Sequence, residues 1–296
     1  MEELKEWNVV SLLKKTAEYF IAKNVDEPRI SSELLLGHVL SLGRLQLYLN
    51  HDRVLSQDEL DRFRTLCRQR LGGRPVQYIT GEQYFYGLSF MVDERVLIPR
   101  PETELLVEHA LASLGMTARG GQARANVLDI GTGSGCIAVT IAKLCPSLKV
   151  TAVDCSLAAL AVARENAARH GVESQVTFIQ ADMFDEEFAA RVPESAYDLI
   201  VSNPPYIPRT EWEGLQREVR EYEPEIALTT QEGFECYKAI TELAPSLLGP
   251  GGKLCLELHA DGATAVSELI ALHGFTGITL SKDYSGLERI ISGNLP

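Results

Sequence analysis

Apolar residues recur at helical spacing in the first part of the chain. The segments that show this pattern are 7–21, 34–40 and 60–71. A helix is predicted to begin at Ser56, because Glu59 three residues later completes a capping-box pattern. Gly72 and Gly73 are expected to end it. With no strand pattern between these segments, the sequence predicts a small helical-bundle domain over residues 1–82.

The pattern changes between residues 83 and 100. Gln83–Val92 is rich in aromatic residues, and Val96–Ile98 is apolar and β-branched. Asp93 and Glu94 separate these two runs. Two such runs around a polar pair predict a β-hairpin, which we interpret as a linker between two domains.

Helical and strand patterns alternate over residues 101–296. Helices are predicted over 102–114, 136–144, 157–170, 235–248 and 262–273, and strands over 126–130, 149–153, 176–179, 198–202, 253–258, 276–280 and 288–292. This alternation predicts a Rossmann-like α/β domain, in which helices cover both faces of a mostly parallel sheet. Ligands of such sheets bind at the carboxyl ends of the strands.

Composition excludes several classes of protein. Hydrophobic residues make up 45% of the chain, yet no apolar run approaches membrane-spanning length. Residues 1–15 lack the layout of a signal peptide. The six cysteines form no C-x-x-C pair, so neither a disulfide framework nor a zinc site is expected. These features favour a cytoplasmic protein that has reduced thiols and no metal.

The net charge of −13 lies entirely on residues 91–296, because residues 1–90 are balanced. An acidic second half is a poor match for the DNA backbone, so direct DNA binding is not expected. A basic stretch without acidic residues carries Arg62, Arg64, Arg68, Arg70 and Arg74. It is either a solvated helix face or a contact for an acidic partner.

A glycine-rich loop follows the first predicted strand of the α/β domain and opens a helix. Its sequence is Asp129-Ile130-Gly131-Thr132-Gly133-Ser134-Gly135. A dinucleotide site would require glycine at position 136, which is Cys136. The spacing G-x-G-x-G is that of enzymes that use S-adenosylmethionine (SAM). A tight turn without a ligand is the alternative.

Acidic residues also follow the next two predicted strands. Asp154 can accept hydrogen bonds from both ribose hydroxyls of a nucleoside, or cap the following helix. Asp182 with Met183 and Phe184 could contact an adenine ring, or form a plain loop.

Asn203-Pro204-Pro205-Tyr206 follows another apolar strand and predicts a rigid loop that holds a planar nitrogen. The two prolines remove two backbone donors. The Asn203 side-chain oxygen and the Pro204 carbonyl can each accept one hydrogen bond from a substrate NH2 group. Tyr206 offers a flat face for an amide or a nucleobase. A rigid turn without a substrate is the alternative.

An amide nitrogen is a weak nucleophile because its lone pair is delocalised. Two acceptors on its N–H groups stabilise the positive charge that develops during methyl transfer, and positioning supplies much of the remaining rate. The N-protonated amide product is strongly acidic. We therefore expect no dedicated general base and assign no catalytic histidine.

Longer motifs are more specific than these loops. They are Arg74-Pro75-Val76-Gln77-Tyr78-Ile79-Thr80-Gly81, Leu97-Ile98-Pro99-Arg100-Pro101-Glu102-Thr103-Glu104, Tyr222-Glu223-Pro224 with Ala227-Leu228, and Lys282-Asp283-Tyr284 with Gly286-Leu287-Glu288-Arg289. With them the chain resembles the release factor glutamine methyltransferases (PrmC/HemK) nearly from end to end. The resemblance implies a class I SAM-dependent methyltransferase. It would methylate the glutamine side-chain amide in the Gly-Gly-Gln motif of class 1 peptide chain release factors, in support of translation termination.

The resemblance also assigns sites. SAM would lie along Gly131–Gly135, Asp154 and the Asp182-Met183 turn, and the product would be S-adenosylhomocysteine. The glutamine amide would lie on Asn203–Tyr206, and the helical domain would contact the release factor away from the reacting loop. The chain departs from the family at Met183, where an aromatic residue is common. It also departs at residues 231–233, where only Gly233 matches.

Three alternatives remain at this point. A ribosomal protein glutamine methyltransferase would share the architecture, although the 101–104 motif favours a release factor. A DNA adenine N6-methyltransferase would share the Asn203–Tyr206 loop, but the acidic charge and the lack of a target-recognition domain oppose it. Cys136 and the same loop oppose an NAD enzyme or a simple nucleotide-binding module.

Overall fold

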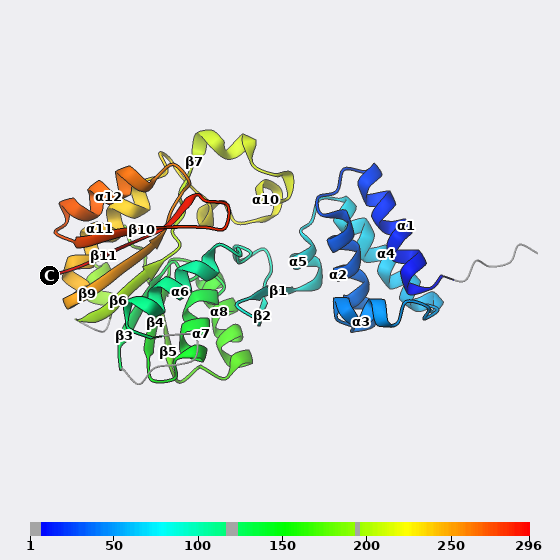
Figure 1. Cartoon of the computed structure of the whole chain (residues 1–296), viewed down its shortest axis with the longest axis horizontal. Coiled ribbons are helices and arrows are strands. Elements are labelled where there is room, and N and C mark those ends of the chain that lie inside the picture. Colours follow the sequence, from blue (N-terminus) through cyan, green and yellow to red (C-terminus); the bar gives the residue numbers. More distant parts are fainter. Residues whose placement is uncertain (1–6, 117–123, 193–195) are drawn as a thin grey trace, which may run out of the picture. The chain divides into compact units, whose positions relative to one another are not determined.

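The computed structural model describes residues 7–116, 124–192 and 196–296. The chain forms two compact units, each described here by itself (Figure 1). The helical unit comprises Met1–Glu82 and Gln216–Tyr222, and the α/β unit comprises Gln83–Leu215 and Glu223–Pro296. The sequence pattern does not predict that a segment near residue 220 belongs to the helical unit.

The helical unit contains the three helices that the periodic pattern predicts. Its described helices are α1 (Val9–Ala22), α2 (Pro28–Leu40), α3 (Arg44–Leu49), α4 (Gln57–Leu71), α5 (Val76–Thr80) and α10 (Arg217–Tyr222). The capping box of α4 is confirmed: Ser56 Oγ accepts from the Glu59 N–H, and the Glu59 carboxylate accepts from the Ser56 N–H. The pattern misses α3 and α5 because five or six residues are too few to show a helical period.

Arg70 is a buried cation inside the helical unit, with only 5% of its surface exposed. Its guanidinium donates to Ser31 Oγ, to the carbonyl oxygens of Asp26 and Arg74, and to the Glu218 carboxylate of α10. A buried charge is tolerated when it is paired and hydrogen-bonded, and Arg70 meets that condition with four hydrogen bonds. It therefore ties α10 to α2 and α4.

The arginines of the basic stretch thus differ in burial and in their contacts. Arg70 is structural, which neither interpretation of the sequence includes. Arg64 is exposed and donates to Asp61 at 2.8 Å, and Arg62 donates to the Val39 carbonyl oxygen at 2.9 Å. These contacts are typical of a solvated helix face, and a contact with an acidic partner stays a prediction.

The predicted hairpin is present, but its bounds are wrong. It consists of β1 (Glu82–Phe85) and β2 (Leu88–Met91), and Val96–Ile98 is not a strand. The turn lies at Tyr86-Gly87 instead of Asp93-Glu94. Both turn residues have left-handed φ, +52° and +74°, as a two-residue hairpin turn of type I′ requires. A tyrosine in this conformation is unusual, so the sequence gives little sign of the turn.

The α/β unit is built on a seven-stranded sheet with the order β10-β11-β9-β6-β3-β4-β5. Its strands are β3 (Asn126–Ile130), β4 (Lys149–Asp154), β5 (Val176–Gln180), β6 (Tyr197–Ser202), β9 (Leu248–Glu257), β10 (Thr276–Lys282) and β11 (Glu288–Asn294). The strands from β5 to β9 pair in parallel, and β11 is antiparallel to both of its neighbours. The predicted α/β fold with a mostly parallel sheet is confirmed.

Helices cover both faces of this sheet (Figure 1). They are α6 (Thr103–Ser113), α7 (Cys136–Leu144), α8 (Leu157–His170), α9 (Phe188–Arg191), α11 (Glu235–Leu247) and α12 (Ala263–Leu272). Val127 packs on the face covered by α6 and α7, and its neighbour Leu128 packs on the face covered by α11 and α12. This two-sided burial explains why Val127, Leu128 and Ile130 follow no alternation of apolar and polar positions, as in strands of buried parallel sheets. No helix in the described part of the chain has the length and apolar character of a membrane span.

Short elements fill the connection between β6 and α11. They are β7 (Ile207–Pro208), η1 (Arg209–Gly214), η2 (Glu225–Ala227) and β8 (Thr229–Thr230), in addition to α10. The Ile207 N–H donates to the Leu228 carbonyl oxygen at 3.0 Å, within the parallel pair β7–β8. A Cβ at Gly233 would lie 2.9 Å from the Tyr206 carbonyl oxygen, so only glycine lets this connection pack against the Asn203–Tyr206 loop.

Replacing Arg70 by Met should lower the free energy of unfolding of the helical unit by about 2–4 kcal/mol, because Glu218 and three other acceptors lose their donor. Urea unfolding followed by Trp7 fluorescence in a Trp212→Phe background measures this unit. Arg64→Met is the matched control. Its exposed ion pair should contribute less than about 1 kcal/mol, and equal losses in the two variants would contradict the structural role of Arg70.

Candidate active site

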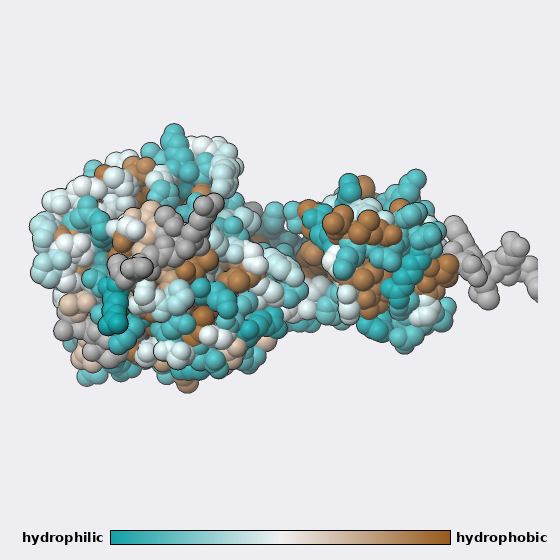
Figure 2. Space-filling view, turned by 60° about the horizontal axis from the view of Figure 1, so that its bottom comes forward, coloured by the Kyte–Doolittle hydropathy of each residue, from teal (hydrophilic) through white to brown (hydrophobic). Residues whose placement is uncertain are grey.

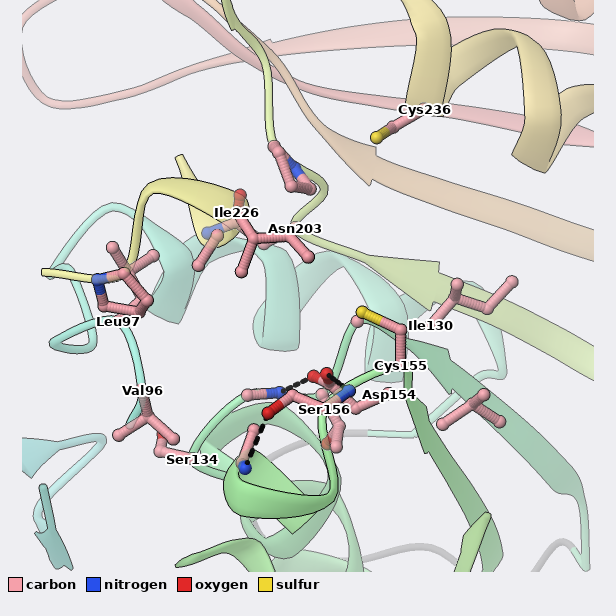
Figure 3. A pocket seen from close by; sticks show the side chains of 18 of the residues that line it. Val96, Leu97, Ile130, Ser134, Asp154, Cys155, Ser156, Asn203, Ile226 and Cys236 are labelled. Atoms are coloured by element: carbon pink, nitrogen blue, oxygen red, sulfur yellow. Dashed lines mark hydrogen bonds between the residues drawn. The ribbon is translucent and has the colours of Figure 1, made fainter. Parts of the chain in front are cut away.

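A cavity of about 480 Å³ opens where the chain leaves β3, β4 and β6 (Figure 3). Its size suits a small ligand such as a nucleoside. Of the residues singled out in the sequence, it is lined by Gly131, Thr132, Gly133, Ser134, Asp154, Asp182, Met183, Asn203 and Pro205. Gly135, Pro204 and Tyr206 are not among the lining residues. The structure thus gathers most of the predicted residues, from distant parts of the chain, around one cavity.

The glycine-rich loop is held by the end of β4. The N–H groups of Gly131 and Thr132 both donate to the Val153 carbonyl oxygen, at 2.8 and 2.9 Å. Below the loop, the fully buried Asp129 accepts from the Thr132 hydroxyl at 2.7 Å. Burial raises the pKa of Asp129 to about 7, and the Thr132 hydrogen bond acts against this shift. The loop is therefore fixed from two sides before any ligand binds.

The three glycines of the loop have two different reasons to be glycine. All three have left-handed φ, between +55° and +80°. A Cβ at Gly131 or Gly133 would meet no atom within 4 Å, so the backbone there borders open space. A Cβ at Gly135 would lie 3.0 Å from Ala163 Cβ on α8. Gly135 therefore serves the packing of α7 on α8, whereas Gly131 and Gly133 keep the cavity wall thin.

Asp154 lies at the end of β4 and turns its carboxylate toward the loop (Figure 3). One oxygen accepts from the Gly133 N–H and the other from the Ser156 N–H, both at 2.9 Å. Burial raises the pKa of Asp154, and the two backbone donors act in the opposite direction. The helix cap of α8 is supplied by Ser156, whose Oγ accepts from the Ala159 N–H. Asp154 is thus free of the capping role that the sequence left open.

Asp182, Met183 and Phe184 follow β5. Asp182 accepts from the Phe184 N–H at 3.0 Å, which forms a tight turn. Met183 packs against the core on one side and lines the cavity, and the Phe184 side chain is 58% exposed. An apolar cavity wall of this kind can cover one face of a flat ring.

The Asn203–Tyr206 loop begins directly after β6. Asn203 lines the cavity, and Pro204 is buried. Tyr206 is directed into the protein: its ring lies edge-on to His259 at 5.8 Å, and its hydroxyl donates to Glu257 Oε1 at 3.2 Å. The loop is therefore anchored at the tyrosine and open at the asparagine.

The sequence pattern misses two polar residues that contact this loop. Asn203 Nδ2 donates to Thr103 Oγ1 at 3.1 Å, and Thr103 Oγ1 donates to Glu257 Oε2 at 2.7 Å. Glu257 is 1% exposed, and burial raises its pKa to about 7. The signals available for them were weak: Thr103 is part of a longer motif without an assigned role, and Glu257 is an acid within an apolar strand.

Asn166 on α8 connects the hairpin to the cavity. It is fully buried, and its oxygen accepts from the Met91 N–H at 2.7 Å. Its Nδ2 donates to the carbonyl oxygens of Met91 and Ser134, at 3.0 and 2.9 Å. The hairpin is therefore part of the wall that supports the glycine-rich loop. Across the described residues, no group of three or more His, Cys, Asp or Glu side chains could hold a metal ion.

Known proteins resemble both parts of the chain. Residues 11–81 match the PrmC N-terminal domain, and residues 102–215 match the methyltransferase small domain. The release factor glutamine methyltransferase of Chlorobaculum tepidum is 54% identical, and that of Geobacter sulfurreducens is 41% identical. Each of these alignments covers 99% of both chains. This chain belongs to the release factor glutamine methyltransferase family. The membership expected from the longer motifs is confirmed.

The fold also occurs in more distant methyltransferases. A solved methyltransferase from Pyrococcus furiosus matches 71% of this chain and 90% of its own, with a TM-score of 0.50 and 21% identity. At this identity the likeness concerns the fold alone. In this chain the cavity lies in the α/β unit, which contains the residues that match the methyltransferase small domain.

The two kinds of glycine predict different outcomes. Gly135→Ala should lower the thermal midpoint by several degrees, because its methyl group meets Ala163 and the left-handed φ adds strain. Gly133→Ala carries similar φ strain without the collision, so its midpoint should fall less. Differential scanning calorimetry compares them, and an equal or larger loss for Gly133→Ala would contradict the packing role of Gly135.

Proposed function

We propose that this protein transfers a methyl group from SAM to the side-chain amide of the glutamine in the Gly-Gly-Gln motif of class 1 release factors. The observation that carries the proposal is the placement of Asn203 and the glycine-rich loop on one cavity. The relatives support the substrate, because those named above are release factor glutamine methyltransferases.

The cavity fits SAM on its own chemistry. The thin wall at Gly131 and Gly133 leaves room for a ligand close to the backbone. Asp154 can accept from ribose hydroxyls through the remaining lone pairs of its two oxygens. Met183 provides an apolar surface for adenine, in place of the aromatic residue common in the family. SAM, when bound, would supply a methyl group on a positively charged sulfur, and we propose that no metal takes part.

The Asn203–Tyr206 loop, which we call the acceptor loop, would orient the glutamine amide. In our proposal Asn203 Oδ1 and the Pro204 carbonyl oxygen each accept one amide hydrogen, which fixes the nitrogen and stabilises its developing positive charge. Tyr206 shapes the loop through its bond to Glu257, and stacking on the amide is the less supported role because its ring packs inward. Pro205 lines the cavity and keeps the loop rigid.

The alternatives are weaker. Relatives that align over the full length are release factor enzymes, which disfavours a ribosomal protein as substrate. The acidic charge of residues 91–296 disfavours DNA. We also propose that the enzyme acts in the cytoplasm, together with its release factor substrate.

We further propose that the helical unit contacts the release factor. In Figure 2 apolar side chains gather on the visible face of this unit. Its exposed large apolar residues are Val10, Tyr19, Ile21, Leu45, Tyr48, Leu49 and Val54. Surfaces of this kind are typical of protein–protein contacts.

Incubation with an intact class 1 release factor and SAM should add 14 Da, one methylene, to the glutamine of Gly-Gly-Gln, and tandem mass spectrometry locates it. A short Gly-Gly-Gln peptide should react with a much higher KM if the helical unit provides a second contact. A release factor with Gly-Gly-Glu is the negative control. Methylation of a ribosomal protein, with none on the release factor, would refute the substrate.

Asn203→Ala should reduce kcat about 100-fold or more, because one acceptor of the amide is lost. Its affinity for S-adenosylhomocysteine should change less than about 3-fold. Asp154→Asn should weaken the affinity for S-adenosylhomocysteine about 10-fold or more and affect kcat less. Isothermal titration calorimetry and single-turnover methylation separate the two effects. A collapse of cofactor affinity in Asn203→Ala would refute the assigned role of Asn203.

A further inference from the structure

Three side chains form a hydrogen-bonded chain behind the acceptor loop. Asn203 Nδ2 donates to Thr103 Oγ1 at 3.1 Å, and Thr103 Oγ1 donates to Glu257 Oε2 at 2.7 Å. Thr103 and Glu257 are 2% and 1% exposed, so bulk water does not compete for these bonds. Asn203 and Thr103 both line the cavity, and Asn203 is the more exposed of the two.

The direction of this chain is set by proton counting. A threonine hydroxyl has one proton, and an ionised carboxylate only accepts. Because the Thr103 hydroxyl donates its one hydrogen bond to Glu257, the Thr103 oxygen can only accept a hydrogen bond from Asn203. The two ends of an asparagine amide are nearly equal in shape, so hydrogen bonding decides between the orientations. Here it selects the orientation with Nδ2 on Thr103.

The remaining end of the amide, Oδ1, then faces away from Thr103. In the proposed function, that oxygen accepts a hydrogen bond from the substrate NH2 group. A reversed amide would present NH2 to NH2, with no acceptor between them. The orientation behind the loop therefore decides whether the loop can hold its substrate.

We propose that Thr103 and Glu257 are positioning residues, which hold the Asn203 side chain in the one orientation that accepts a hydrogen bond from the substrate amide. This rests on the proposed function for its consequence in catalysis. Glu257 also accepts from the Tyr206 hydroxyl at 3.2 Å. One buried carboxylate thus holds both ends of the acceptor loop.

Protonation of Glu257 should remove the constraint on the Asn203 orientation. A carboxylic acid can donate a hydrogen bond to Thr103, and the Thr103 hydroxyl can then donate to Asn203 instead of accepting from it. Glu257 has its pKa raised to about 7, first by burial, while Thr103, Tyr206 and Arg289 act in the opposite direction. The other titratable groups that interact with it are Glu102 before α6, Cys136 on α7 and Tyr237 on α11. The ionised form positions Asn203, so kcat should fall as the pH is lowered through about 7.

The orientation can be measured without turnover. The side-chain NH2 resonances of Asn203 in the ¹⁵N-labelled full-length protein are assigned by their absence from Asn203→Ala. In the wild type one of these protons should exchange slowly, because it is donated to Thr103. Thr103→Val keeps the shape but not the hydroxyl, and should speed this exchange about 10-fold or more. Thr103→Ser keeps the hydroxyl and should restore slow exchange.

Turnover provides the second reading. Thr103→Val should lower kcat about 10–100-fold at unchanged affinity for S-adenosylhomocysteine. Thr103→Ser should recover most of that loss. Glu257→Gln, like the protonated acid, can donate to Thr103 and does not ionise near neutral pH, so its kcat should be low and the fall of kcat below about pH 7 should disappear.

The outcomes separate this proposal from the proposed function. Fast exchange of the Asn203 NH2 group in the wild type, or an unaltered rate in Thr103→Val, would overturn the positioning role even if the release factor is methylated. Slow exchange that depends on Thr103, in a protein that does not methylate glutamine, would support the positioning role and refute the proposed function. Equal losses of kcat in Thr103→Val and Thr103→Ser would also overturn the positioning role of Thr103.

Discussion

The parallel pairing of β3 with β4 and β6 is the constraint on which the rest of the site depends. Parallel strands end at the same edge of a sheet, so the loops after them meet whatever their distance along the chain. Register pairs Ile130 with Val153, and Asp129 with Val201. The Ser202 hydroxyl donates to the Ile130 carbonyl oxygen at 2.6 Å, which joins the ends of β3 and β6 directly. The glycine-rich loop and the Asn203–Tyr206 loop are thereby held on one cavity.

Hydrophobic pattern and loop chemistry predict most of this arrangement. β3, β4 and β6 are mostly buried because helices cover both faces of the sheet, and the glycine-rich loop and the Asn203–Tyr206 loop follow β3 and β6. Sequence predicts poorly where conformation depends on distant contacts. Tyr86 takes a left-handed φ that few tyrosines adopt, and so the sequence pattern predicts the hairpin turn several residues too late.

The same limit explains why two polar residues behind the acceptor loop were missed. Thr103 and Glu257 are 154 residues apart, and each becomes meaningful only when α6 and β9 place it beside Asn203. Their burial makes this hydrogen bond energetically important, because a buried polar group without a protein partner could not form a hydrogen bond to water. Arg70 is a similar case: in the sequence it is one of five basic residues, and only burial distinguishes it.

We propose that one cavity holds both the cofactor and the glutamine amide, and a crystal structure with S-adenosylhomocysteine and a Gly-Gly-Gln peptide would show whether it does. We expect the nucleoside against Gly133 and Asp154, and the glutamine nitrogen within hydrogen-bonding distance of Asn203 Oδ1 and the Pro204 carbonyl oxygen. A glutamine bound elsewhere, or an Asn203 side chain that presents Nδ2 to it, would refute this arrangement.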